Sequence, residues 1–237
     1  MQKSFRRARF RCGLRAGIPI VLGYVPVGIA YAILARQAGF TVRETCAMSL
    51  FVYAGASEMM AAGMYAQGAG IAAIILATFV LNLRQAIMST CVFHLTPGAS
   101  APLRVLGSFG VTDETFAVFT AEQPKHHNLP FFLGLALIAY LSWNLGTLAG
   151  ALASDLLPDI LTASLGIALY AMFLGLLVPG ASRSWQLTAL CVLTGLCNTL
   201  LSRFLPSGWA LIASTLVCAF AGSFFADPDG GKEEAHV

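Results

Sequence analysis

Charged residues are scarce in this sequence: Asp, Glu, Lys and Arg make up only 11% of its 237 residues. A soluble domain typically has about 25% charged residues, and no linker divides this chain into two soluble units. Hydrophobic residues make up 57%, and they gather in runs of about 20, the length that crosses a bilayer as a helix. The composition therefore excludes a soluble fold and predicts one all-α polytopic membrane domain over residues 1–237.

Sequence signatures of catalysis and metal binding are also lacking. The six cysteines are scattered, without a Cys-x-x-Cys pair or a Cys/His cluster of metal-binding spacing. No Walker sequence occurs, and Gly55-Ala56-Ser57 is not completed to a nucleophile motif by a second glycine. We therefore expect no enzymatic activity, no cofactor and no metal.

Positive charge is concentrated at the N-terminus. The basic residues there are Lys3, Arg6, Arg7, Arg9, Arg11 and Arg15. A basic segment (residues 1–13) directly before an apolar run predicts a cytoplasmic N-terminus. Nucleic acid is not an expected partner, because a membrane span follows at once. A cleaved signal peptide ending at Ala30-Tyr31-Ala32 is disfavoured by the length of the apolar run. At the other end, residues 227–237 form a polar tail.

The apolar runs predict seven to eight transmembrane helices. Seven runs lie near 14–36, 45–66, 69–93, 130–153, 160–179, 185–203 and 206–226. The segment 103–121 is too polar around residues 107–114 to face lipid. A re-entrant or broken helix fits it, because non-helical backbone at membrane depth is tolerated only inside protein or beside a wet cavity. An ordinary extramembrane loop with a capped helix remains an alternative, and a full crossing would make eight spans.

Prolines and glycines punctuate the first apolar run. Pro19 and Pro26 lie close to Gly23 and Gly28, and proline removes a helical hydrogen bond. We therefore predict a broken first helix, whose freed backbone groups would bind an amino-acid head group as in transporters. A kink that serves packing is the alternative.

Three polar motifs interrupt or adjoin the apolar runs. They are Ala54-Gly55-Ala56-Ser57-Glu58, Asn82-Leu83-Arg84 and Thr112-Asp113-Glu114. An ionisable side chain in hydrocarbon costs at least about 2.5–3.5 kcal/mol, so each needs a substrate, an ion path or an internal partner. The small residues before Glu58 would let a helix or a substrate approach the backbone closely.

The charged members of these motifs leave several pairings open. Burial of Glu58 disfavours its charged form, which suits proton binding; it would equally accept an ammonium group or pair with Arg84. Arg84 has no neutral form, so it needs a carboxylate. Asp113 and Glu114 are its other candidate partners, and a substrate carboxylate is the remaining one.

Two weaker patterns complete the sequence evidence. Gly28 and Ala32 in the first run parallel Gly146 and Gly150 in the fourth, and Asn82 parallels Asn198, as in transporters built from repeats. Trp143 and Asn144 interrupt the fourth run. They would line a cavity or, for Asn144, make a hydrogen bond between helices.

Four motifs occur in order: Gly23-x-x-Pro26-x-Gly28, Tyr53-Ala54-Gly55-Ala56-Ser57-Glu58, Asn82-Leu83-Arg84-x-x-x-Met88-Ser89 and Thr112-Asp113-Glu114-x-Phe116-Ala117. Together they resemble the AzlC-type branched-chain amino acid permease family, over roughly residues 12–180. The resemblance implies the large subunit of a two-part exporter in the bacterial cytoplasmic (inner) membrane, with a small hydrophobic AzlD-type partner subunit. The family commonly has Gln at the position of Glu58, so the carboxylate here would add a proton site or change the substrate.

We therefore expect a secondary transporter that exports branched-chain or other small apolar amino acids. The expected substrate-binding residues are Gly23, Pro26, Gly28, Gly55, Ala56, Ser57, Glu58 and Asn82. The expected coupling or charge network consists of Glu58, Arg84, Asp113 and Glu114. The alternative is a structural or regulatory membrane subunit without transport activity of its own, whose buried charges join helices. A passive channel is disfavoured because no repeated filter sequence occurs.

Overall fold

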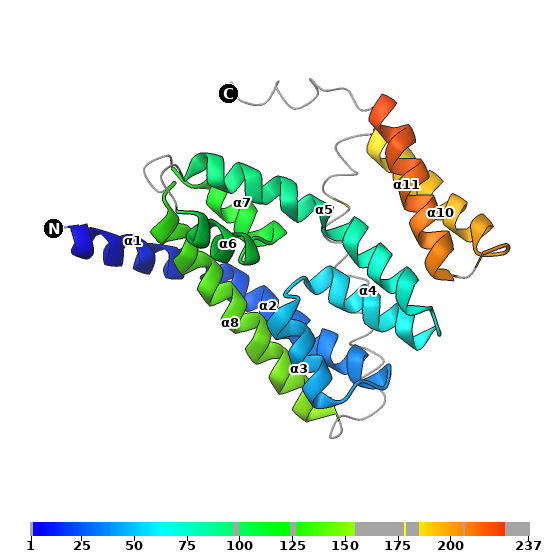
Figure 1. Cartoon of the computed structure of the whole chain (residues 1–237), viewed down its shortest axis with the longest axis horizontal. Coiled ribbons are helices and arrows are strands. Elements are labelled where there is room, and N and C mark those ends of the chain that lie inside the picture. Colours follow the sequence, from blue (N-terminus) through cyan, green and yellow to red (C-terminus); the bar gives the residue numbers. More distant parts are fainter. Residues whose placement is uncertain are drawn as a thin grey trace.

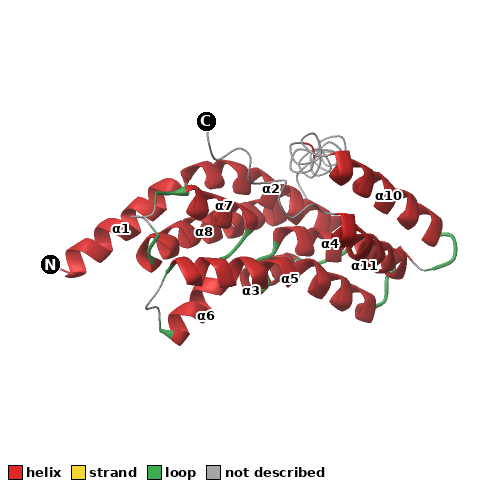
Figure 2. Ribbon diagram, turned by 90° about the horizontal axis from the view of Figure 1, so that it is seen from above, coloured by secondary structure: helices red, strands yellow, loops and turns green. Residues whose placement is uncertain are grey.

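The protein is all-helical wherever its structure is described. The computed structural model describes residues 2–96, 100–123, 127–154, 178, 185–205 and 207–225, and this part contains no β-strand. Its helices are α1 Gln2–Ala16, α2 Ile18–Gln37, α3 Val42–Phe51, α4 Gly55–Ala66, α5 Ile71–Leu95, α6 Ala101–Phe109, α7 Asp113–Ala121, α8 Leu129–Ala153, α10 Trp185–Leu201 and α11 Ser207–Phe225 (Figures 1 and 2). The all-α prediction is confirmed. The predicted span 160–179 and the tail 227–237 lie outside the described residues.

Within the described residues, three helices are long and apolar enough to cross a membrane: α2, α5 and α8, of 20, 25 and 25 residues. At 1.5 Å per residue they are about 30–38 Å long, which matches a hydrocarbon core of about 30 Å. They correspond to the predicted spans 14–36, 69–93 and 130–153. The last two helices, α10 and α11, carry shorter apolar segments and pack against each other. The total number of crossings stays a prediction.

The predicted break in the first helix is wrong. α2 runs from Ile18 to Gln37 with Pro26 inside it, and Gly28 lies in regular helix. Pro26 lacks the N–H that would bond the Leu22 carbonyl, but the helix continues through it to Gln37. The turn at Gly17, which separates α1 from α2, is an interruption at the start of the run rather than at mid-depth.

Packing against α8 holds α2 in place. A Cβ on Gly146 would lie 2.6 Å from the Val25 carbonyl oxygen, and one on Gly150 would lie 2.6 Å from that of Ile29. Gly28 is similarly close to the α8 backbone. Only residues without a side chain allow this approach. Because Val25 meets Gly146 and Ile29, one turn later, meets Gly150, the two helices run parallel. Gly28, Gly146 and Gly150, which the sequence analysis compared as equivalent positions of two repeats, thus lie in one interface between α2 and α8.

The second apolar run, predicted as the span 45–66, is broken into the two short helices α3 and α4. The chain leaves helical geometry at Val52–Ala54, where Tyr53 has φ +46°. The helices contain 10 and 12 residues, about 15 and 18 Å, each about half a bilayer core. The Phe40 ring, before α3, and the Tyr65 ring, at the end of α4, lie 4.9 Å apart. Residues 42–66 therefore enter the molecule and return to the same end; we call them hairpin A.

α6 and α7 form a second such hairpin. Each has nine residues, about 14 Å, and the break lies at Gly110–Thr112. A Cβ on Gly107 would contact Leu129, at 3.8 Å, while the rings of Phe119 and Phe131 lie 6.3 Å apart. Both legs therefore lie beside the beginning of α8 (Figure 1). We call residues 101–121 hairpin B.

The two hairpins enter from opposite ends of α8 and meet in the interior. Hairpin A starts where Arg36 of α2 donates a hydrogen bond to Ser154, after the end of α8, at 3.1 Å. Hairpin B starts at the other end of α8. Their breaks touch, with the Tyr53 and Phe109 rings 5.8 Å apart. Two short helices separated by a break fit the broken helix predicted for 103–121, and the choice between a re-entrant segment and an extramembrane loop with a capped helix stays a prediction.

Candidate functional site

A cavity of about 730 Å³ lies where the breaks of the two hairpins meet α2, α5 and α8. Its size falls within the range of small-molecule sites, about 300–1,000 Å³. Among the residues predicted for substrate binding or the charge network, those that line it are Gly23, Gly55, Ala56, Ser57, Asn82, Arg84, Asp113 and Glu114. Pro26, Gly28 and Glu58 do not line it. Trp143 lines it as well, which confirms one prediction for that side chain.

The beginning of α4 forms one wall of this cavity. Ala54, at its N-cap, makes no side-chain capping hydrogen bond, so the first-turn N–H groups of Gly55, Ala56 and Ser57 keep the partial positive charge of a helix start. A Cβ on Gly55 would lie 2.6 Å from the Trp143 ring. Glycine at this position therefore lets the indole close the wall.

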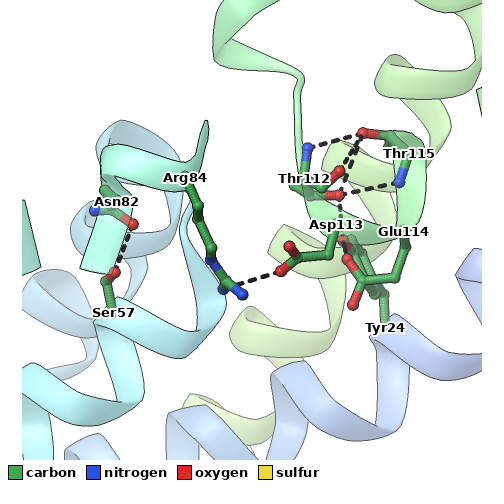
Figure 3. Close-up of polar contacts among 8 residues, drawn as sticks. All are labelled: Tyr24, Ser57, Asn82, Arg84, Thr112, Asp113, Glu114 and Thr115. Atoms are coloured by element: carbon green, nitrogen blue, oxygen red, sulfur yellow. Dashed lines mark hydrogen bonds and ion pairs between the residues drawn. The ribbon is translucent and has the colours of Figure 1, made fainter. Parts of the chain in front are cut away.

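A hydrogen bond joins two of the polar motifs beside this wall. The Ser57 hydroxyl donates to Asn82 Oδ1 at 2.7 Å, linking the first turn of α4 to α5 (Figure 3). A short polar link of this kind fixes the relative depth of two helices in a membrane protein. Asn144, in contrast, donates to the Tyr140 carbonyl of its own helix at 2.9 Å and does not line the cavity, so neither role predicted for it is realised.

Arg84 of the second motif is paired with Asp113 of the third. Arg84 Nη2 lies 2.9 Å from Asp113 Oδ2, and both side chains are nearly half exposed, at 45% and 44% (Figure 3). Of the alternatives for Arg84, the structure thus selects an internal partner, and that partner is Asp113 rather than Glu58. A half-exposed pair adds little stability, about 0–1 kcal/mol, so its position between α5 and α7 in the cavity wall matters more than its energy.

Tyr24 holds the first turn of α7. Its hydroxyl donates to Glu114 Oε2 at 2.5 Å and lies 2.7 Å from Thr112 Oγ1 (Figure 3). Thr112 also caps the helix, because its Oγ1 accepts from the Thr115 N–H while Thr115 Oγ1 accepts from the Thr112 N–H. Sequence reasoning missed Tyr24. The available signal was a hydroxyl between Gly23 and Pro26 in an otherwise apolar run.

Glu58 lies behind the cavity wall and is completely buried. Its carboxyl oxygens accept hydrogen bonds from Ser49 Oγ at 2.8 Å, from the Ala54 N–H at 2.9 Å and from Trp143 Nε1 at 3.3 Å. Ser49 is also 2.9 Å from Thr147 Oγ1. Glu58 therefore ties α3, the break of hairpin A and α8 together, and it touches the cavity through Trp143.

Tyr53 is the second residue that sequence reasoning left without a role. It sits at the break of hairpin A, lines the cavity and is only 3% exposed. Its ring packs against Phe109 and Tyr140. Its buried hydroxyl has no hydrogen-bond partner among the described groups. A buried polar group without a partner is costly, and it therefore calls for an explanation.

Residues 18–66 and 71–121 repeat one layout with inverted direction. Each consists of a long apolar helix, α2 or α5, followed by a hairpin. Gln37 ends α2 and Leu95 ends α5, 58 positions later; Gly55 and Asp113 begin α4 and α7, again 58 apart. Tyr24 and Asn82 are also 58 apart, and each bonds the first turn of the other unit's hairpin. This repeat differs from the pairing of the first and fourth runs expected from the sequence.

Comparison with known proteins adds independent evidence. The model of the AzlC protein family matches residues 19–157, a range that contains α2 to α8 and the whole cavity. An uncharacterized membrane protein of Archaeoglobus fulgidus is 37% identical over 184 residues, covering 76% of this chain and 79% of that one. The inner membrane protein YgaZ of Escherichia coli is 30% identical over 222 residues, covering 89% and 88%.

A further relative carries a functional name. The branched-chain amino acid transport protein AzlC of Bacillus subtilis is 27% identical over 147 residues, covering 61% of this chain and 58% of that one. No solved structure shows significant similarity to the chain. The sequence relatives, rather than a known fold, therefore connect this cavity to a biological role.

Proposed function

Since the chain belongs to the AzlC family, we propose that it is a secondary transporter that exports branched-chain or other small apolar amino acids across the bacterial inner membrane. In this proposal it acts with a small hydrophobic AzlD-type partner subunit. The observation that carries the proposal is the meeting of two broken-helix hairpins, from opposite ends, at one cavity. Transporters bind substrates near the bilayer midplane at interrupted helices of inverted repeats.

The basic N-terminal helix sets the orientation. α1 lies beside the beginning of α8, the end at which hairpin B starts. If the basic residues keep this end in the cytoplasm, hairpin B enters from the cytoplasm and hairpin A from outside. Each hairpin then separates the cavity from one face of the membrane. Movement of one hairpin at a time would open the cavity to alternate sides.

The roles of the site residues follow from their positions. Gly23, Gly55, Ala56, Ser57 and Asn82 would contact the substrate, since they line the cavity. Arg84, Asp113 and Glu114 would form the charge network in the same wall. Glu58 would take part in coupling indirectly, because its carboxyl group accepts a hydrogen bond from Trp143, which lines the cavity. Pro26 and Gly28 would support the site by shaping α2 and its packing on α8.

Counterflow in proteoliposomes tests the proposal. The chain is reconstituted alone and with its AzlD-type partner, the vesicles are loaded with unlabelled leucine, isoleucine, valine or alanine, and uptake of the labelled amino acid is followed. Accumulation that depends on the internal amino acid is expected. Absence of flux from both samples contradicts the transporter proposal and favours a structural or regulatory subunit. Flux from the pair alone makes the partner essential.

A further inference from the structure

We propose that the cavity binds a zwitterionic α-amino acid in one orientation, with the carboxylate at the start of α4 beside Tyr53 and the ammonium group at Glu114 of α7. This inference rests on the proposed function and specifies how the same cavity recognises its substrate. It is carried by a chemical difference between the two helix starts that meet there.

The start of α4 presents uncapped backbone hydrogen-bond donors to the cavity. Gly55, Ala56 and Ser57 line the cavity, and their N–H groups have no side-chain cap. Glu58 does not compete for this position, because three donors already hold its carboxyl group. A helix start of this kind favours an anionic group.

Tyr53 gives the second, independent indication of a ligand here. It lines the cavity directly before α4, and its hydroxyl is buried without a partner among the described groups. A ligand carboxylate at the α4 start would accept its hydrogen bond and remove the unsatisfied donor.

The start of α7 has the opposite character. Asp113 and Glu114 occupy its first turn, where Gly55 and Ala56 stand in the other unit. Arg84 pairs with Asp113 at 2.9 Å, whereas the described salt bridges give Glu114 no cation. Glu114 receives a hydrogen bond from the Tyr24 hydroxyl, on Oε2. One carboxylate in the cavity is therefore held in place with its negative charge uncompensated, and it fits an ammonium group.

The rest of the lining suits an apolar side chain. It includes Ile20, Val27, Met59, Ala117 and Val118. A carboxylate and an ammonium group on one carbon atom satisfy both helix starts at once. A simple carboxylate would leave Glu114 without a counter-charge, and a simple amine would leave the Tyr53 hydroxyl without an acceptor. The cavity therefore distinguishes an amino acid from either half of it.

The test uses three probes: L-leucine, 4-methylpentanoate, which lacks the ammonium group, and 3-methylbutylamine, which lacks the carboxylate. Affinities are measured on the purified full chain by competition with labelled leucine. Tyr53→Phe should weaken leucine and 4-methylpentanoate by about tenfold or more and leave 3-methylbutylamine unchanged. Glu114→Gln should weaken leucine and 3-methylbutylamine by a similar factor and should not weaken 4-methylpentanoate.

Matched controls lie outside the cavity. Tyr65→Phe and Glu122→Gln make the same chemical changes at residues that do not line it and should leave all three affinities unchanged. A variant of Tyr53 or Glu114 that weakens all three probes equally, or a crossed pattern, overturns the orientation while leaving the proposed function intact. Wild-type protein that binds leucine but neither analogue at a hundredfold higher concentration also overturns it. Wild-type protein that binds no amino acid overturns the proposed function itself.

Discussion

The buried carboxyl of Glu58 makes a prediction that can be worked out atom by atom. Its Oε2 accepts from Ser49 and Trp143, and its Oε1 accepts from the Ala54 N–H. Glu58→Gln keeps the shape but supplies one oxygen and one NH₂ group. In one orientation of the amide the NH₂ faces the Ala54 N–H, and in the other it faces Trp143 Nε1–H. The Ser49 hydroxyl can reverse, since Thr147 Oγ1 is 2.9 Å away.

One buried donor is therefore left without an acceptor whichever way the amide turns. The cost of such a group is about 1–3 kcal/mol, and in a chain of this size that corresponds to a fall in Tm of roughly 2–12 °C. Ser49→Ala removes one donor and should cost about 1 kcal/mol. The two changes affect one network, so the double variant should be less destabilised than the sum of the single variants.

Thermal unfolding of purified protein measures the stability, and tryptophan emission reports the local effect. In a background with Trp185→Phe and Trp209→Phe, Trp143 is the remaining tryptophan, and Glu58→Gln should shift its emission. Tyr65→Phe, which changes an exposed side chain, is the control and should shift neither reading. Unchanged Tm and unchanged Trp143 emission in Glu58→Gln would refute the hydrogen-bond network. Transport with unaltered pH and gradient dependence would show that Glu58 does not couple protons.

Three further predictions concern the cavity, the helix interface and the hairpins. Gly55→Ala places a Cβ 2.6 Å from the Trp143 ring and should abolish most counterflow, whereas Gly63→Ala, whose Cβ meets nothing within 4 Å, should not; equal flux from both contradicts the proposed wall. Gly146→Ala places a Cβ 2.6 Å from the Val25 carbonyl and should destabilise the protein by about 1–3 kcal/mol, while Gly195→Ala, with an open environment, should leave Tm nearly unchanged. Single cysteines at Gly39 and Gly68, in a cysteine-free background, should react with a membrane-impermeant maleimide from the same side of oriented vesicles, because the two legs of hairpin A share one end; labelling from opposite sides would mean that residues 42–66 cross the membrane.

The spanning helices could be predicted from the sequence, but the hairpin in residues 42–66 could not. Hydropathy and length identify α2, α5 and α8, since each is one long apolar run. The legs of hairpin A contain 10 and 12 residues and together have the length of one crossing. Apolar content alone cannot distinguish a segment that crosses from one that turns back. The break also falls at Tyr53, a residue with φ +46° that carries no helix-breaking signature.

The candidate site was predicted better than the fold around it. Small and charged residues in apolar runs drew attention to Gly55, Arg84 and Glu114, and the structure brings them to one cavity. The sequence overvalued Pro26, because α2 continues through this proline as a regular helix, which membrane helices tolerate when packing supports them. The role of Tyr24 could not be predicted, because a tyrosine in an apolar run fits simple aromatic packing. Only the structure shows that its hydroxyl bonds the Glu114 carboxylate.

The crossed hydrogen bonds between the repeated units bear on how the cavity would open. Tyr24 of α2 holds hairpin B through Glu114, and Asn82 of α5 holds hairpin A through Ser57. A hairpin that withdraws must therefore break a bond to the long helix of the other unit; hairpin A would in addition break the bond from Tyr31 of its own unit to the Thr45 carbonyl. In the proposed binding mode the substrate contacts Glu114 and Ser57, the two hairpin residues that make these hydrogen bonds. Binding of an amino acid would thus change the strength of both hydrogen bonds together. Both hairpins could then respond to one substrate.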